Sequence, residues 1–348
     1  MDARLTLLLR VVRSVLVGVF CRGSLIVGRS TDRRLSRARQ CVFVRGGLSW
    51  AGAIVVVLGL LMPTSAVAQR GSATRVSYGP PLARSTIDRR DDSRKPQIHV
   101  MYVLPSDRVD RALDTDGTLK NTVSSFQAWL SAKTGGRALR LDTFRGSLDI
   151  SFFRLSRTDA QIESYGAFVR DQIELEIKAA GFNAPKKIYA VYYDGTSDTA
   201  CGGGAWPPTL PGNVAAMYLN GLPASPVPCA SNQFAGVDGA PTYLEFAMLH
   251  EIMHTMGFVP TCAPHQWRAG HVSDNPNDLM WAGDGAWVPD GWASVVLDSG
   301  NDDYFKAPIR GCLDLARSRF LSKYEPKVRL DEHPRLATFE VAYSRSNP

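Results

Sequence analysis

His250-Glu251-Ile252-Met253-His254-Thr255-Met256-Gly257 is the stretch of sequence that decides how this chain is interpreted. His250 and His254 are one helical turn apart, so on a helix their imidazoles project from the same face and can reach one ion. Glu251 lies beside the first of them, where its carboxylate can contact a water on that ion rather than the ion itself. Apolar neighbours predict a helix that begins near Pro241-Thr242 and ends at Gly257. The stretch therefore predicts a metal centre on a helix, with Glu251 as the base.

Regular elements alternate along the chain before this helix. Strands separated by long helices predict an α/β (α+β) fold with a mixed sheet, two long helices, the site helix and an irregular C-terminal part. Gly and Pro residues predict a loop from Cys201 to Gly212. The expected strands are Ile98–Leu104, Leu139–Phe144, Leu148–Leu155, Lys187–Tyr193 and Val214–Leu219, and the expected helices are Thr118–Ala132 and Asp159–Ala180.

The positive charge of the chain is confined to its beginning. Residues 1–50 hold ten arginines against two aspartates, a charge of +8, so the remainder of a chain with net charge +7 carries −1. An apolar run at 52–62 follows the arginines, and a small-x-small sequence ends at Ala68. These are the parts of an export signal. We predict cleavage after Ala68 and secretion, with no nucleic acid partner and no stable membrane partner after cleavage.

The leader leaves two points open. The apolar stretch 51–68 is just long enough to act as an uncleaved membrane anchor instead. The true start also stays open, because a leader of 68 residues is long. Residues 69–95 are polar and rich in Pro, Gly, Ser and Arg, which predicts a disordered linker or short pro-segment. We expect one domain at 96–348, divided into an upper part, 96–257, and a lower irregular part, 258–348.

Four cysteines follow the leader, an even number that in an exported chain indicates disulfides. Three pairings are possible. We favour Cys201–Cys229 and Cys262–Cys312, because each would close a loop beside the site. A zinc site made of cysteines is disfavoured, because the chain has no CxxC pair.

The glycine three residues after His254 extends the motif. With it the sequence resembles the metzincin zinc proteases, whose motif reads HExxHxxGxxH and is followed by a methionine turn. This chain departs from the motif at Pro260, which cannot bind a metal, so the third ligand must come from elsewhere. We favour His271 over the alternative His265, because its spacing to Leu279-Met280 is similar to that in compact metzincins. An insertion before the third histidine is known in the leishmanolysin-like branch.

The resemblance implies a catalytic zinc with three imidazole ligands and one open position, and a zinc-dependent endopeptidase acting on protein or peptide substrates. Met280 would form the floor beneath the ion, and an extended peptide would pair with Val214–Leu219 as the sheet edge. Asp274 or Asp278 would orient a ligand, although both are equally good turn formers. Ala282 stands where some branches have a tyrosine.

Two other functions stay open: a non-catalytic secreted module that binds zinc or mediates adhesion, and a zinc amidase acting on non-protein amides. Glu251 argues against the module, because a pure binder needs no base. An acidic cluster near the C-terminal part could bind calcium, but we favour its interpretation as a solvated turn. Its residues are Asp298, Asn301, Asp302 and Asp303. The sequence does not indicate an oligomeric state.

Overall fold

The computed structural model describes residues 79, 82–221, 229–231, 233–236, 239–281, 287 and 289–323. The predicted leader, 1–68, and its alternative as an anchor at 51–68 lie outside these residues. Within the described ranges, no helix has the length and hydropathy needed to cross a membrane.

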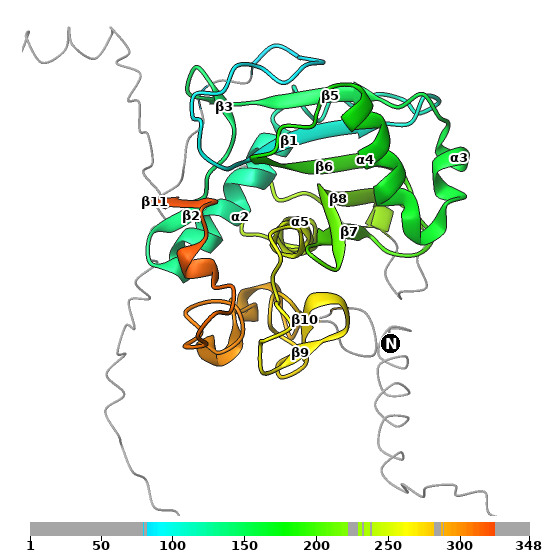
Figure 1. Cartoon of the computed structure of the whole chain (residues 1–348). Coiled ribbons are helices and arrows are strands. Elements are labelled where there is room, and N and C mark those ends of the chain that lie inside the picture. The colour runs from blue at the N-terminus through cyan, green and yellow to red at the C-terminus, as the bar shows by residue number, and fades with distance from the viewer. Residues whose placement is uncertain are drawn as a thin grey trace, which may run out of the picture. The chain divides into compact units, whose positions relative to one another are not determined.

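A five-stranded mixed sheet forms the upper part of the molecule (Figure 1), in the order β5-β1-β6-β8-β7. β5, β1, β6 and β8 are mutually parallel, and β7 is antiparallel to β8 at the edge. This arrangement confirms the predicted α+β class with a mixed sheet. The strands are β1 (Gln97–Leu104), β5 (Ile150–Arg154), β6 (Lys187–Thr196), β7 (Gly202–Trp206) and β8 (Leu210–Asn220).

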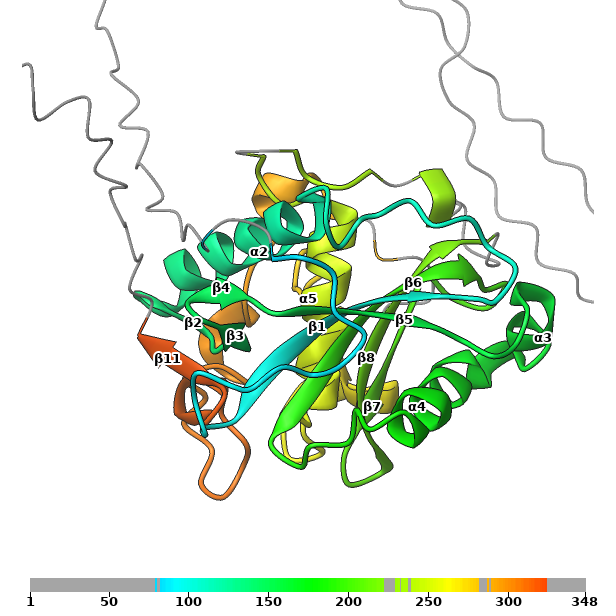
Figure 2. The ribbon, with the colours of Figure 1, turned by 90° about the horizontal axis from the view of Figure 1, so that it is seen from above.

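Helices cover both faces of this sheet. Figure 2 shows α2 (Thr118–Thr134) and α5 (Tyr243–Thr255) on one face and α3 (Asp159–Glu163) with α4 (Val169–Ala179) on the other. Side chains alternate between the two faces along each strand, as the two-residue repeat of a strand requires. In β1, for example, Val100 and Tyr102 belong to the core under α2 and α5, whereas Met101 and Val103 belong to the core under α4.

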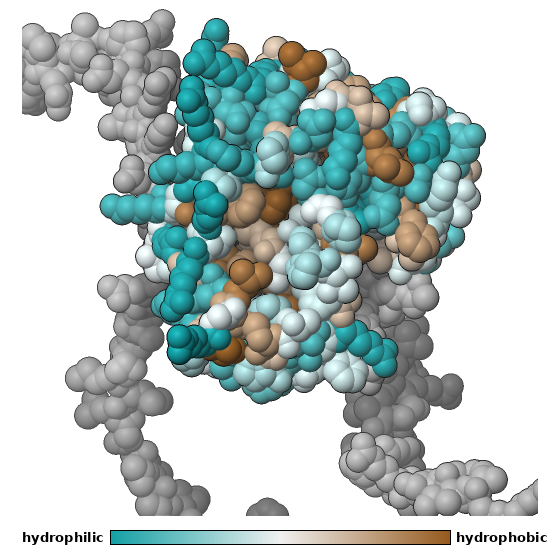
Figure 3. Space-filling model, viewed as in Figure 1, coloured by the Kyte–Doolittle hydropathy of each residue, from teal (hydrophilic) through white to brown (hydrophobic). Residues whose placement is uncertain are grey.

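Within the described residues, the lower part from Phe258 onward contains only short elements, as expected. The face shown in Figure 3 is largely hydrophilic over the sheet, and apolar residues gather where the upper layers meet this lower part. The remaining strands are β2 (Arg137–Leu139), β3 (Thr143–Phe144), β4 (Ser147–Leu148), β9 (Gln266–Trp267), β10 (His271–Val272) and β11 (Leu321–Lys323). The 3-10 turns are η1 (Gly166–Phe168), η2 (Cys229–Ser231), η3 (Arg268–Gly270), η4 (Trp292–Ser294), η5 (Ser299–Asn301) and η6 (Leu315–Arg317).

Two predicted elements are divided in the structure. The single helix expected at Asp159–Ala180 consists of α3, η1 and α4, because Gly166 adopts a left-handed conformation (φ 54°) that interrupts the helix. The strand expected at Leu139–Phe144 is divided into β2, which pairs with β11, and β3, which forms a hairpin with β4.

The predicted loop between Cys201 and Gly212 is instead a hairpin. β7 turns through Pro207-Pro208 into β8, which begins at Leu210 rather than at Val214. β7 therefore forms the edge of the sheet, and the expectation that Val214–Leu219 is the edge is wrong. The run Gly202-Gly203-Gly204 has no apolar alternation, so only its pairing with β8 identifies it as a strand.

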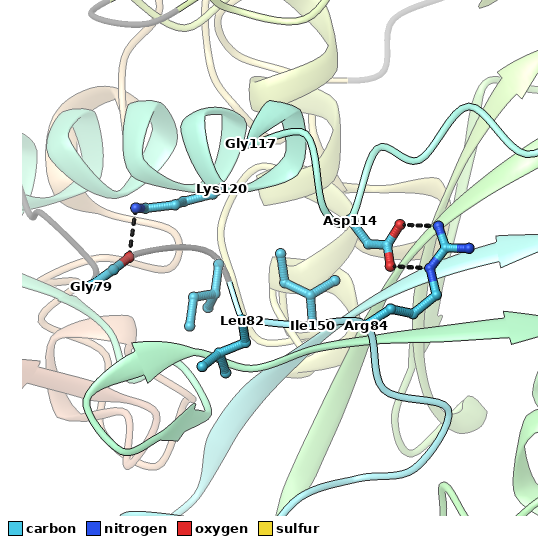
Figure 4. A pocket seen from close by; sticks show the side chains of 8 residues that line it. Gly79, Leu82, Arg84, Asp114, Gly117, Lys120 and Ile150 are labelled. Atoms are coloured by element: carbon cyan, nitrogen blue, oxygen red, sulfur yellow. Dashed lines mark hydrogen bonds and ion pairs between the residues drawn. The ribbon is translucent and has the colours of Figure 1, made fainter.

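The disordered linker or short pro-segment is expected at 69–95, of which residues 69–78, 80 and 81 lie outside the described residues. Residues 82–95 lie as an ordered strap against the domain. The backbone N–H of Phe152 donates to Ser85 O over 2.7 Å. The ammonium of Lys187, which is buried, pairs with Asp88 and Asp91 of the strap, each at 2.6 Å. Figure 4 shows a small pocket where Arg84 of the strap pairs with Asp114. Ion pairs with residues far along the chain hold the strap in place. The local sequence pattern could not predict its order for that reason.

Both expected disulfides are present. Cys201–Cys229 joins the residue before β7 to η2, and Cys262–Cys312 joins the segment after α5 to the segment between η5 and η6. The second bridge encloses β9 and β10, so it ties the inserted loop to the rest of the chain.

Candidate metal centre

α5 carries the two histidines of the motif and is held firmly at both ends. Thr242 and Glu245 form a capping box at its N-terminus, in which Thr242 N donates to Glu245 Oε2 over 3.0 Å. At the other end Gly257 takes a left-handed conformation (φ 91°), which lets the chain leave the helix sharply. The helix packs on β7 and β8 of the sheet. His250 and His254 are therefore fixed on a buried, well-anchored element.

Three imidazoles converge beside this helix. The Nε2 atoms of His250 and His254 are 2.9 Å apart, and the Nε2 atom of His271 lies 3.0 Å from that of His254 and 3.2 Å from that of His250. His271 reaches them from the start of β10. Three nitrogens bound to one zinc at about 2.0–2.1 Å in tetrahedral geometry are roughly 3.3 Å apart. The observed spacing fits such an ion.

The hydrogen bond made by Nδ1 of each ring determines which of the two ring nitrogens carries the proton. His250 Nδ1 donates to Leu279 O over 2.6 Å, His254 Nδ1 to Phe258 O over 3.2 Å and His271 Nδ1 to Arg268 O over 2.7 Å. A carbonyl only accepts, so each Nδ1 carries the proton and each Nε2 presents a lone pair. Three lone pairs facing one another repel. This is the arrangement of metal ligands, not of a hydrogen-bonded cluster.

Burial keeps the three rings neutral. It lowers the pKa of His250 to about 3 and the pKa of His254 well below the usual value, with further lowering from the neighbouring imidazoles. Burial also lowers the pKa of His271. Neutral imidazole is the form that binds metal, so the site is prepared for a cation at neutral pH.

Glu251 lies between α5 and the edge strand. A Cβ added to Gly202 would lie 2.5 Å from Glu251 Oε1, and one added to Gly204 would lie 3.1 Å from Oε2. Burial raises the pKa of Glu251 to about 8, against the opposing effects of the Arg170 guanidinium and a hydrogen bond from the Gly204 backbone. Gly202 and Gly204 thus make room for the carboxylate, and the backbone of Gly204 donates to it. Sequence reasoning missed them, although three successive glycines next to Cys201 were visible.

The structure separates the two candidates for the third ligand. His271 lies with His250 and His254, whereas His265 Nδ1 lies 3.1 Å from Asp303 Oδ2. Asp274 lies in the group of His265 and Asp303, not beside the three imidazoles.

Asp278 and Met280 shape the turn beneath the site. Asp278 is buried and accepts hydrogen bonds from Met280 N over 2.7 Å and from Tyr304 Oη over 2.9 Å. It contacts the turn rather than a histidine, and this turn presents the Leu279 carbonyl to His250. Met280 is fully buried there. The Leu279 carbonyl is a second feature that sequence reasoning did not identify, because backbone groups leave no mark in the sequence.

A hollow of about 420 Å³ opens near the N-terminus of α5. Phe234, Tyr243 and Trp292 are among its lining residues, and Tyr243 and Trp292 contact each other edge to face with ring centroids 6.2 Å apart. Burial and, to a smaller extent, the charge of Glu251 raise the pKa of the Tyr243 phenol to about 12. The hollow lies at the N-terminal end of the helix that carries Glu251, and neither Glu251 nor the three histidines line it.

No protein-family model matches this sequence, and no curated protein matches it. Two solved structures are similar to it in part. Archaemetzincin from Methanopyrus kandleri has a TM-score of 0.30 and 14% identity, over 59% of this chain and 88% of that one. OgpA from Akkermansia muciniphila has a TM-score of 0.32 and 16% identity, over 56% of this chain and 57% of that one. Similarity this low assigns neither a family nor an activity.

Proposed function

We propose that this chain is a secreted zinc-dependent endopeptidase, with His250, His254 and His271 as the zinc ligands and Glu251 as the general base. The observation that carries the proposal is the convergence of three Nε2 lone pairs within 2.9–3.2 Å, each ring held by a backbone carbonyl. Zinc in such a site supplies Lewis-acid chemistry, acidifying water and polarising a carbonyl. Three protein ligands rather than four are typical of catalytic zinc.

Glu251 moves the proton. Its carboxylate takes a proton from the attacking water and returns it to the leaving amine. Burial outweighs the opposing effects of the Arg170 guanidinium and the Gly204 backbone, and the pKa of Glu251 rises to about 8, close to neutral pH. A base works best when its pKa lies near the working pH. A purely binding site has no need of this carboxylate.

β7 is the element along which a peptide would lie. It is the edge of the sheet, and an edge strand presents unpaired backbone groups to an extended chain. Its glycines let that chain approach closely. The substrate strand in this proposal therefore pairs with β7 and not with β8. The hollow beside Tyr243 and Trp292 would take one substrate side chain.

Replacing Glu251 by Gln tests the mechanism. The variant keeps the shape of the side chain but cannot accept the proton, so we expect hydrolysis of casein or a peptide library to fall by at least 100-fold. Zinc content, measured by elemental analysis, should stay unchanged. Chelation should abolish the activity of the wild-type protein, and added zinc should restore it. Wild-type activity in Glu251→Gln would refute the mechanism, and hydrolysis of non-protein amides alone would favour the amidase.

A further inference from the structure

Trp206, the last residue of β7, reaches from the edge of the sheet to the segment that follows α5. Its side chain is half-buried, and the indole Nε1 donates to the backbone carbonyl of Val259 over 3.1 Å. Val259 itself is fully buried. This hydrogen bond therefore joins the edge strand of the sheet to the start of the lower part.

The segment that Trp206 contacts lies between two of the three imidazoles. The carbonyl of Phe258 accepts the hydrogen bond from His254 Nδ1 over 3.2 Å. The N–H of the next residue, Val259, donates to the carbonyl of Gly270 over 3.0 Å. Gly270 directly precedes His271 in the chain. A shift of this segment would therefore disturb the positions of both His254 and His271.

The indole also packs directly against Gly270. A Cβ added to this glycine would lie 2.3 Å from Trp206 Nε1, so the ring leaves no room for a side chain there. Gly270 is buried and ends the turn η3, and its φ of 83° is one that glycine adopts readily. The first residue of that turn, Arg268, accepts the hydrogen bond from His271 Nδ1 over 2.7 Å. Trp206 thus lies against the turn that orients the third imidazole.

The third imidazole depends on contacts of this kind more than the other two do. His250 and His254 lie on α5, a helix of 13 residues, whereas His271 begins β10, a strand of two residues. β10 pairs with β9, which also has two residues. A two-stranded hairpin is at best marginally stable by itself. The position of His271 therefore has to be fixed by residues outside the hairpin.

We propose that Trp206 is a positioning residue for the metal centre, acting on His254 and His271 through Val259 and Gly270. This inference rests on the proposed function, because it concerns the same metal ion. Residues that orient metal ligands without binding the metal raise its affinity, because the ligands are already arranged when the ion arrives. Trp206 belongs to the edge strand, so one strand both makes room for the base and steadies the third ligand.

The zinc affinity of matched tryptophan variants tests the proposal. The exported protein is stripped with a chelator, and its Kd for zinc is measured by competition with a coloured chelator. Trp206→Ala removes the ring and should raise the Kd by about tenfold or more. Trp206→Phe keeps a ring but removes the N–H donor, and should raise the Kd by about threefold. The control Trp129→Phe makes the same exchange at a half-buried ring on α2 and should leave the Kd unchanged.

The melting temperature of the metal-free proteins separates positioning from a purely structural role. A ring that only fills space would lower the Tm of the metal-free protein and leave the zinc affinity alone. We expect the reverse in Trp206→Phe, a weaker zinc affinity with a metal-free Tm close to that of the wild type. This variant also keeps the test decisive if Trp206→Ala does not fold.

The outcomes distinguish this inference from the proposed function. An unchanged zinc Kd in Trp206→Phe, or an equal rise in Trp129→Phe, would overturn the positioning role and leave the peptidase standing. Zinc binding that weakens as expected in a protein without hydrolytic activity would overturn the peptidase and leave the positioning role standing. A wild type that binds no zinc would overturn both.

Discussion

At the scale of single residues, the site depends on which nitrogen of each imidazole bears the proton. Three backbone carbonyls, those of Leu279, Phe258 and Arg268, make that choice. Residue type and helical spacing predicted His250 and His254 as ligands, and the resemblance favoured His271 over His265 as the third. The structure brings the rings of these three histidines together. The sequence could not identify the carbonyls, because any residue supplies one.

The buried histidines should make the metal-free protein sensitive to acid. His254 is 5% exposed and its folded pKa lies well below the unfolded value near 6.5. Below about pH 6.5 the histidine binds a proton in the unfolded chain but not in the folded chain. The free energy of unfolding therefore decreases as pH falls. The effect is at most about 1.4 kcal/mol per pH unit for each histidine. Urea unfolding of chelated protein between pH 7.5 and 5 should show a shallower decrease in His254→Gln, and equal slopes would contradict the expectation.

At the scale of elements, the sequence predicted those helices and strands whose own apolar residues recur at helix or strand spacing. β1, β6, α2 and α5 have apolar residues at strand or helix spacing, and the structure has them close to the expected bounds. β7 was missed because glycine has no face to bury, and its strand character comes entirely from pairing with β8. The predicted edge of the sheet was therefore wrong by one strand.

A methyl group on β7 should damage catalysis without damaging the fold. In Gly202→Ala the new Cβ would lie 2.5 Å from Glu251 Oε1, and the flexible end of that side chain would move aside. Displacing a catalytic group by about 1 Å can cost on the order of 100-fold in rate. We expect kcat to fall by tenfold or more, with zinc content and Tm close to the wild type. Gly291→Ala is the control, because its Cβ would meet no atom within 4 Å. Full activity in Gly202→Ala would show that β7 does not position the base.

At the scale of the whole molecule, residues 82–95 pack against the domain that the sequence predicts to begin at residue 96. The strap 82–95 is polar, and polar segments without apolar periodicity are typical of disorder. Its order comes from partners up to about a hundred residues away, such as Lys187, which no local sequence pattern reveals. The four disulfide cysteines, in contrast, were paired correctly, because each pair closes a loop beside the site.

Removing the strap should destabilise the domain. A protein that begins at Pro96 leaves the nearly buried Lys187 with Asp142 alone and leaves Asp149 without Arg89. Breaking a buried ion pair by removing one partner typically costs about 3–5 kcal/mol. We expect a Tm at least 10 °C below that of a protein beginning at Gly79, measured by circular dichroism at equal zinc. Equal melting temperatures would show that the strap is dispensable.

The origin of the third imidazole has a consequence for the proposed site. His250 and His254 belong to the layered upper part, whereas His271 belongs to the lower part, whose described elements are short. The two parts already share one hydrophobic core. An ion bound by all three imidazoles would add a second connection between them, so a shift of the β9–β10 hairpin would disturb metal binding even if α5 did not move.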